Sequence, residues 1–165
     1  MKEIEVKILE IDVDSVIKKL ESLGAVKEGE FDIEASHYDF DKEGVSLRLR
    51  KIGEKVEFTS KKKIDSDRYK IRDEFQVEVD DFDKMDSLLK SIGLGDKIDL
   101  HKKRISYVLV DVRFEIDTYD GIPTFLEIEA PSEEKLEETV EMLGFSMSDA
   151  KPWSWKKVLK HYGKI

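Results

Sequence analysis

The chain begins with MKEIEVKIL (residues 1–9), in which charged and apolar side chains alternate. Successive side chains of a β-strand point to opposite faces, so Glu3, Glu5 and Lys7 share one face while three aliphatic side chains share the other. This stretch therefore predicts a strand with one apolar and one charged face. The fold depends on what covers each of them.

The same plan of a strand followed by a helix occurs three times. EIEVKILEIDVDSVIKKLESLG (3–24), EFQVEVDDFDKMDSLLKSIG (74–93) and FLEIEAPSEEKLEETVEMLG (125–144) each begin as an alternating strand and continue with helical spacing up to a glycine. In the first copy, Asp12 or Asp14 can cap the helix. The period is too irregular for a solenoid and indicates duplication inside one domain.

Four further alternating segments lie between these copies: VSLRLRKI (45–52), KVEFTSKKK (55–63), KKRISYVLV (102–110) and VRFEIDTY (112–119). No linker rich in proline, glycine or serine separates them, so we expect a single domain over residues 1–165. PWSWKKVLKHYGKI (152–165) predicts a last short helix that opens with proline. The helices need an apolar partner, which only the apolar strand faces offer. The charged face must then be open to water or lie inside a closed or nearly closed barrel.

Acidic and basic side chains on the charged face are sorted by strand. Arg48 and Arg50 have no carboxylate beside them on their strand, and Glu127 and Glu129 have no base beside them. Paired arginines match phosphate oxygens, and carboxylates two residues apart on a strand can share a hard cation. A complex of a polyphosphate with Mg²⁺ or Mn²⁺ would satisfy both halves of this pattern. For any one strand alone, a solvated charged face is the simpler interpretation.

The composition excludes several classes of protein. The formal net charge of −9 argues against broad binding to nucleic acid, and the absence of cysteine rules out disulfides and thiolate metal sites. No apolar run approaches the roughly 20 residues that a membrane span needs, and the first residues lack the apolar segment of a signal peptide. We therefore expect a cytoplasmic protein that binds neither nucleic acid nor membrane.

Several of these motifs together resemble a known family. EIEVK resembles the Glu-x-Glu-x-Lys signature of the CYTH superfamily, or triphosphate tunnel metalloenzymes, which includes class IV adenylyl cyclases, thiamine triphosphatases and inorganic triphosphatases. SLRLRK, RDEFQVEV, KKR and FEIDTYDGIPTFLEIEAP resemble the family's later strands in family order, and SWKKVL resembles the helix that plugs one end of its tunnel. The resemblance implies an α+β fold: an eight-stranded antiparallel β tunnel with a charged interior and helices packed outside, with 152–165 as the plug helix.

The resemblance also implies roles for individual residues. Divalent metal, Mg²⁺ or Mn²⁺, would be held by Glu3, Glu5, Glu127, Glu129 and Asp117. The triphosphate, ATP or tripolyphosphate, would be bound by Lys7, Arg48, Arg50, Lys61, Arg72, Lys102 and Arg104. The catalytic group would comprise Glu5, Lys7, Asp117 and Glu74. A homodimer is implied as well.

The reaction is left open between two chemistries. By overall resemblance the chain is most similar to class IV adenylyl cyclases, in which the ribose 3′-hydroxyl attacks the α-phosphorus of ATP. The cyclases usually carry a His-Phe pair before Glu-x-Glu-x-Lys, whereas only Met1 and Lys2 precede Glu3 here. Gln76 also stands where glutamate is frequent. A triphosphatase is therefore the main alternative. A non-catalytic polyphosphate-binding module is a third hypothesis, although it does not need four clustered glutamates.

Overall fold

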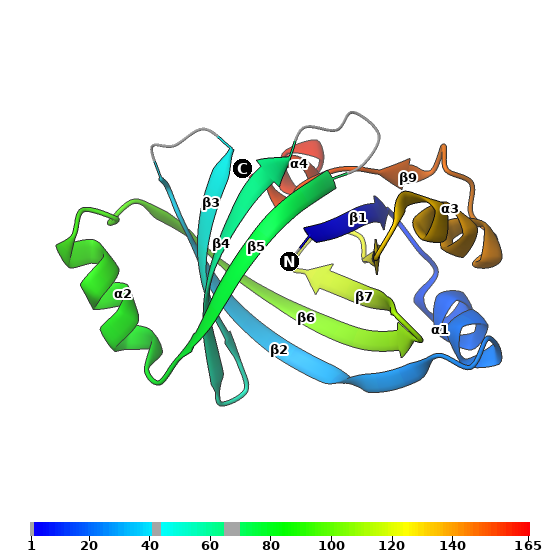
Figure 1. The fold of residues 1–165 in the computed structure, drawn as a ribbon, viewed down its shortest axis with the longest axis horizontal. Helices are drawn as coiled ribbons and strands as arrows, with labels where there is room; N and C mark the ends of the chain where they lie inside the picture. Colours follow the sequence, from blue (N-terminus) through cyan, green and yellow to red (C-terminus); the bar gives the residue numbers. More distant parts are fainter. Residues whose placement is uncertain (1, 41–43, 65–69) are drawn as a thin grey trace.

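In the computed structural model, the strands form a single antiparallel sheet (Figure 1). The structure describes residues 2–40, 44–64 and 70–165, without the side chains of residues 2, 3, 70 and 71. The strands are β1 (Lys2–Ile8), β2 (Val26–Tyr38), β3 (Val45–Ile52), β4 (Lys55–Ile64), β5 (Lys70–Val79), β6 (Lys97–Leu109), β7 (Val112–Tyr119), β8 (Phe125–Ala130) and β9 (Ala150–Lys151). The helices are α1 (Val13–Ser22), α2 (Phe82–Ser91), α3 (Glu133–Met142) and α4 (Trp155–His161).

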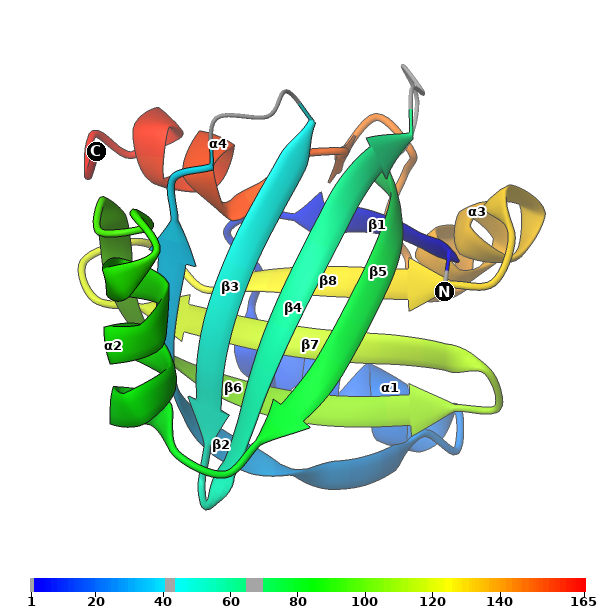
Figure 2. The same cartoon turned by 60° about the vertical axis from the view of Figure 1, so that its left-hand side comes forward.

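The sheet is curled into a half-barrel. Its strand order is β5-β4-β3-β2-β6-β7-β8-β1-β9, and an additional pairing joins β5 to β1. Figure 2 shows the result as two walls, with β3, β4 and β5 crossing in front of β6, β7, β8 and β1. The inner face of the sheet therefore surrounds a common interior.

The expectation of eight strands in a closed or nearly closed tunnel needs a correction. Over the residues that the structure describes, the sheet has nine strands, because the short β9 pairs with β1 at Lys7 and Ile8. Among the described residues, the pairing of β5 with β1 runs from Lys2↔Asp73 to Glu5↔Lys70. β8 occupies the opposite edge of β1. Because β9 takes the far end of the edge that β5 uses, the two ends of the curled sheet meet along part of their length only.

The first helix begins where the sequence predicts. Asp12 caps α1, and its side chain accepts a hydrogen bond of 2.7 Å from the backbone N–H of Ser15. Asp81, Ser132 and Ser154 do the same for the other three helices. Gly24 follows α1 with φ +83°, a left-handed conformation that glycine adopts without steric cost. The predicted helices are therefore present, but the expectation that the last one opens with proline is wrong, because α4 begins at Trp155 after the cap Ser154 and Pro152 lies outside it.

Helices α1, α2 and α3 cover the apolar outer face of the sheet, as predicted. Leu20 of α1 and Leu136 of α3 are fully buried against Val6, Phe114 and Ile128 of the sheet. Each such side chain contributes about 1.5–3 kcal/mol by leaving water. A second cluster joins α2 to β3 and β4, and a third joins α4 to β7 and β8. Within the described ranges, no helix has the length and apolar character needed to cross a bilayer.

Candidate triphosphate and metal site

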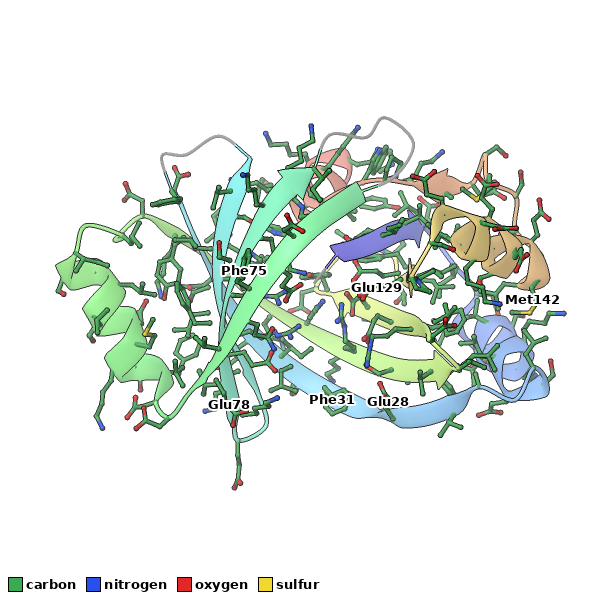
Figure 3. The ribbon with its side chains drawn as sticks, in the orientation of Figure 1. Glu28, Phe31, Phe75, Glu78, Glu129 and Met142 are labelled. Carbon is green, nitrogen blue, oxygen red and sulfur yellow. The ribbon has the colours of Figure 1, made fainter. Side chains whose placement is uncertain are left out.

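The charged inner face lines one large cavity of about 980 Å³. Its walls come from β1 to β8, and α4 adds Ser154, Trp155 and Lys156 at one end. Figure 3 shows Glu129 between β1 and β7, and Glu28 and Phe31 along β2. Several charged side chains on this face are buried, among them Glu5, Lys7 and Asp117. The strand alternation that opens the sequence therefore turns charge inward.

Carboxylates face each other across two strand pairs of the acidic wall. Glu5 of β1 lies directly opposite Glu129 of β8, and Glu127 of β8 lies directly opposite Glu115 of β7. Like charges at directly opposed positions of an antiparallel pair destabilise the sheet. Glu5 and Glu115 are each only 5% exposed, so water screens this repulsion weakly. Such an arrangement calls for a compensating cation.

The chain's own bases supply part of that compensation. The Nζ of Lys7 lies 3.2 Å from Oε1 of Glu5 and also pairs with Oε2 of Glu127. Arg104 approaches the same wall, with Nε 3.4 Å from Glu115 and NH2 3.6 Å from Glu127. The side chains of Lys7 and Arg104 therefore stand among Glu5, Glu115 and Glu127, of which the family resemblance implies Glu5 and Glu127 as metal ligands.

Asp117 is engaged by two bases. Arg104 donates from Nε and from NH2 to its two carboxylate oxygens, both at 2.6 Å, and Lys102 donates to Oδ2 at 2.6 Å. Burial alone would raise the pKa of Asp117, but the charges of Arg104 and Lys102 outweigh burial and lower the pKa below its usual value. Burial and neighbouring Arg104 lower the pKa of Lys102 to about 7.

The basic wall is built from β3, β4 and β5. Arg50 donates to Glu57 Oε2 from Nε at 3.1 Å and from NH2 at 2.5 Å. Lys61 pairs with Glu74 at 2.5 Å, and Arg48 lies 3.9 Å from Glu74. All these bases line the cavity, as do Arg72, Lys102 and Arg104. A polyphosphate chain lying there would meet positive groups from several strands.

The donor set suits a hard divalent cation. Burial raises the pKa of both Glu115 and Glu129, and repulsion from Glu127 raises each further. A bound Mg²⁺ or Mn²⁺ would remove this cost, since both prefer carboxylate oxygens. In the described part of the chain, no three His, Asp or Glu side chains form a ready-made metal cluster. The carboxylate oxygens are therefore suitable donors for such a cation, and in this structure Lys7 and Arg104 contact several of them.

Most of the predicted site residues meet in this cavity. The sequence-predicted residues on its lining are Glu5, Lys7, Arg48, Arg50, Lys61, Arg72, Glu74, Lys102, Arg104, Asp117, Glu127 and Glu129. Glu3 lies on β1 opposite Arg72 in the strand register, but its side chain is outside the described part of the structure. Glu74, expected among the catalytic groups, pairs with bases of the neighbouring strands.

Two carboxylates received no role from the sequence. Glu57 is 5% exposed and neutralises Arg50 across β3 and β4. It stands two residues before Thr59 on an alternating strand, so period-2 spacing places it on the inner face. Glu115 stands two residues before Asp117 and accepts a 2.5 Å hydrogen bond from Ser106. Strand periodicity alone was a sufficient signal for both.

Comparisons with known proteins agree with this architecture. The CYTH domain matches residues 1–151. "Putative adenylate cyclase MJ0240" of Methanocaldococcus jannaschii is 30% identical over 155 residues, which cover 87% of this chain and 88% of that protein. The structure of PH1012 from Pyrococcus horikoshii superimposes with a TM-score of 0.85 at 27% identity, covering 94% of this chain and 98% of the other.

A more distant structure shares the fold. "Putative adenylyl cyclase HpAC1" from Hippeastrum, which is described as having a dominant triphosphatase activity, gives a TM-score of 0.63 at 16% identity. The match covers 99% of this chain and 97% of that one. With the domain match extending over nearly the whole sequence, the chain belongs to the CYTH domain family.

Proposed function

We propose that this protein is a divalent-metal-dependent enzyme that acts on a triphosphate, and that it resembles class IV adenylyl cyclases in converting ATP to cyclic AMP and pyrophosphate. One observation carries the proposal: a basic wall and a wall of opposed carboxylates face each other across one cavity. The first is suited to triphosphate oxygens and the second to the cation that accompanies them.

The basic wall would act mainly by positioning. Phosphoryl and nucleotidyl transfer need alignment and charge neutralisation more than a covalent nucleophile. Arg48, Arg50 and Lys61 would bind the triphosphate from one side, and Lys102 and Arg104 from the other. Asp117 and Glu74 would hold these bases in place. A divalent cation on Glu3, Glu5, Glu127 and Glu129 would neutralise charge on the phosphate oxygens.

For cyclisation, the ribose 3′-oxygen forms a bond to the α-phosphorus while the bond from that phosphorus to the pyrophosphate oxygen breaks. The hydroxyl proton leaves to a base or to solvent. For hydrolysis, water attacks the terminal phosphorus and orthophosphate is released. Triphosphate hydrolysis is the second candidate. Both reactions need a bound triphosphate and its metal, and the two walls would contact only these, so the walls do not distinguish the reactions.

Product analysis separates these reactions. The pure protein would be incubated with ATP and, in parallel, with tripolyphosphate, first in Mg²⁺ and then in Mn²⁺, and the products resolved by chromatography. Cyclic AMP with pyrophosphate supports the cyclase. Orthophosphate without cyclic nucleotide makes the protein a triphosphatase. Binding of ATP or tripolyphosphate without any product in either metal would support the third hypothesis, a non-catalytic polyphosphate-binding module. Glu129→Gln, purified identically, controls for contaminating phosphatases.

A homodimer belongs to the proposal too. Phe75 and Val77 on β5 are 71% and 58% exposed, more than apolar side chains of this size usually are. Sedimentation equilibrium would measure the mass directly. A single species of 19.2 kDa at micromolar concentration would refute the dimer.

A further inference from the structure

Two aromatic side chains, one of them on α4, pack together on the lining of the cavity. The ring centroids of His37 on β2 and Trp155 on α4 lie 4.2 Å apart, with an angle of 38° between the ring planes. Both residues line the cavity. Neither is needed by the two charged walls, so their role requires a separate explanation.

Trp155 is held in place by the rest of α4. Val158 and Leu159 are buried in a cluster with Tyr119 and Phe125, and Trp155 packs against this cluster while also lining the cavity. Its ring is therefore presented to the interior from a fixed support. A pre-positioned aromatic ring binds a planar partner with little loss of conformational entropy.

His37 adjoins the triphosphate-binding wall. It lies directly opposite Arg48 in the β2–β3 register, and on its other side it is opposite Ile98 of β6. Leu100, also on the lining, belongs to the same end. A ligand with phosphates on Arg48 would thus place its next chemical group beside the aromatic pair and an apolar wall.

The charge around His37 restricts which group that is. Burial lowers the pKa of His37 to about 3, and Arg48, Lys102, Lys156 and Arg50 lower it in the same direction. The imidazole is therefore neutral near pH 7 and offers one N–H donor and one nitrogen acceptor. Positive charge that suppresses protonation of His37 would equally repel a cationic ring.

The cavity is large enough for an organic group. Its volume of about 980 Å³ lies at the upper end of the roughly 300–1,000 Å³ typical of sites for drug-sized ligands. A bare triphosphate occupies only part of such a space. The remaining volume includes the aromatic end.

We infer that His37 and Trp155 form a subsite for the neutral aromatic base of a nucleoside triphosphate, which makes the protein prefer ATP-like substrates over tripolyphosphate and over thiamine triphosphate with its cationic thiazolium ring. This inference rests on the proposed function, since the triphosphate must first occupy the two charged walls. It assigns α4 a part in substrate selection in addition to closing the end of the cavity.

Two tryptophans on the same segment give a matched test. Trp155→Leu removes the ring that lines the cavity. Trp153→Leu makes the same chemical change two residues earlier. The centroid of the Trp153 ring lies 5.2 Å from that of the His161 ring and 4.9 Å from Nζ of Lys157. Affinities for ATP, tripolyphosphate and thiamine triphosphate would be measured by titration calorimetry in Ca²⁺, which also takes oxygen ligands. His37→Leu tests the pair from β2 if Trp155→Leu does not fold.

We expect wild type and Trp153→Leu to bind ATP more tightly than thiamine triphosphate. Trp155→Leu should bind ATP about tenfold more weakly, within the range for base stacking on an aromatic side chain, with tripolyphosphate changed less than about twofold. Equal losses for both ligands, or an unchanged ATP affinity, would overturn the subsite. If wild type binds tripolyphosphate but not ATP, the subsite is wrong and the triphosphate function stands. If it binds neither, the proposed function fails and the subsite with it.

Discussion

Arg104 forms a bidentate ion pair with Asp117, donating one hydrogen bond of 2.6 Å to each of the two carboxylate oxygens. Asp117 is 1% exposed, so this pair is removed from water almost completely. A buried aspartate bound in this way orients its bases and has little freedom to bind metal in the same state. We therefore propose that Asp117 positions Arg104 and Lys102 for the triphosphate.

Replacing Asp117 should accordingly cost stability. Asp117→Asn leaves Arg104 and Lys102 close together without their carboxylate, and breaking a buried pair typically costs about 3–5 kcal/mol. Urea denaturation would measure the loss, and tripolyphosphate should restore part of it by neutralising the two bases. Asp111→Asn, an exposed change of the same kind in the β6–β7 turn, is the control. Unchanged stability with lost activity would instead favour a metal ligand.

Glu129 should behave in the opposite way. Burial and the neighbouring Glu127 raise its pKa, so its ionised form destabilises the folded state above the usual glutamate pKa. Glu129→Gln should therefore keep or raise the thermal midpoint while abolishing metal-dependent turnover. Mn²⁺ should raise the midpoint of wild type more than that of the variant. A fully active variant would remove Glu129 from the site.

The alternation of side chains along each strand predicts which residues of that strand share a face, but not which residues of other strands they meet. Because side chains alternate, Glu5 and Lys7 had to share a face, and the apolar stripes of three helices placed those helices on the other face. The strands and helices left open whether the charged face meets water or lines an interior, and only the family resemblance implied an interior. Nothing in a single strand indicates which residue of another strand lies opposite. The facing of Glu5 with Glu129 and of Arg50 with Glu57 is a property of register.

The shape of the sheet was harder to predict for a related reason. β9 has two residues, too few to show any alternation, yet it occupies part of the edge of β1 that β5 would need for a longer pairing. Single strands carry an excess of acidic or basic side chains, but ion pairs between neighbouring strands neutralise part of this charge. Glu74 of β5, for example, pairs with Arg48 of β3 and Lys61 of β4. Both features depend on contacts distant in sequence.

Replacing Arg50 tests whether the site binds a three-phosphate chain more tightly than a single phosphate. Arg50→Ala should weaken binding of tripolyphosphate by about tenfold or more, since a charge-assisted hydrogen bond contributes ~1.5–3 kcal/mol, and should affect orthophosphate much less. Lys51→Ala removes one positive charge from the exposed side of the same strand and is the control. Equal losses for both anions would argue against a site that spans three phosphates.

His37 predicts how stability depends on pH. Its pKa is lowered to about 3 in the folded protein, by burial first and then by Arg48, Lys102, Lys156 and Arg50, whereas an unfolded histidine titrates near 6.5. Between these values the unfolded chain binds the extra proton, so stability rises with pH and is lost as pH falls below about 6.5. At pH 5 the loss attributable to His37 reaches about 2 kcal/mol.

His37→Leu removes this proton and should therefore gain stability relative to wild type as pH falls. The free energy of unfolding of both proteins would be measured in urea at pH 7, 6 and 5. Between pH 7 and pH 5, the free energy of unfolding of the variant minus that of wild type should increase by about 2 kcal/mol. Parallel stability curves for wild type and His37→Leu would mean that His37 takes up its proton while folded, and a protonated His37 beside Trp155 would no longer favour a neutral base over a cationic ring.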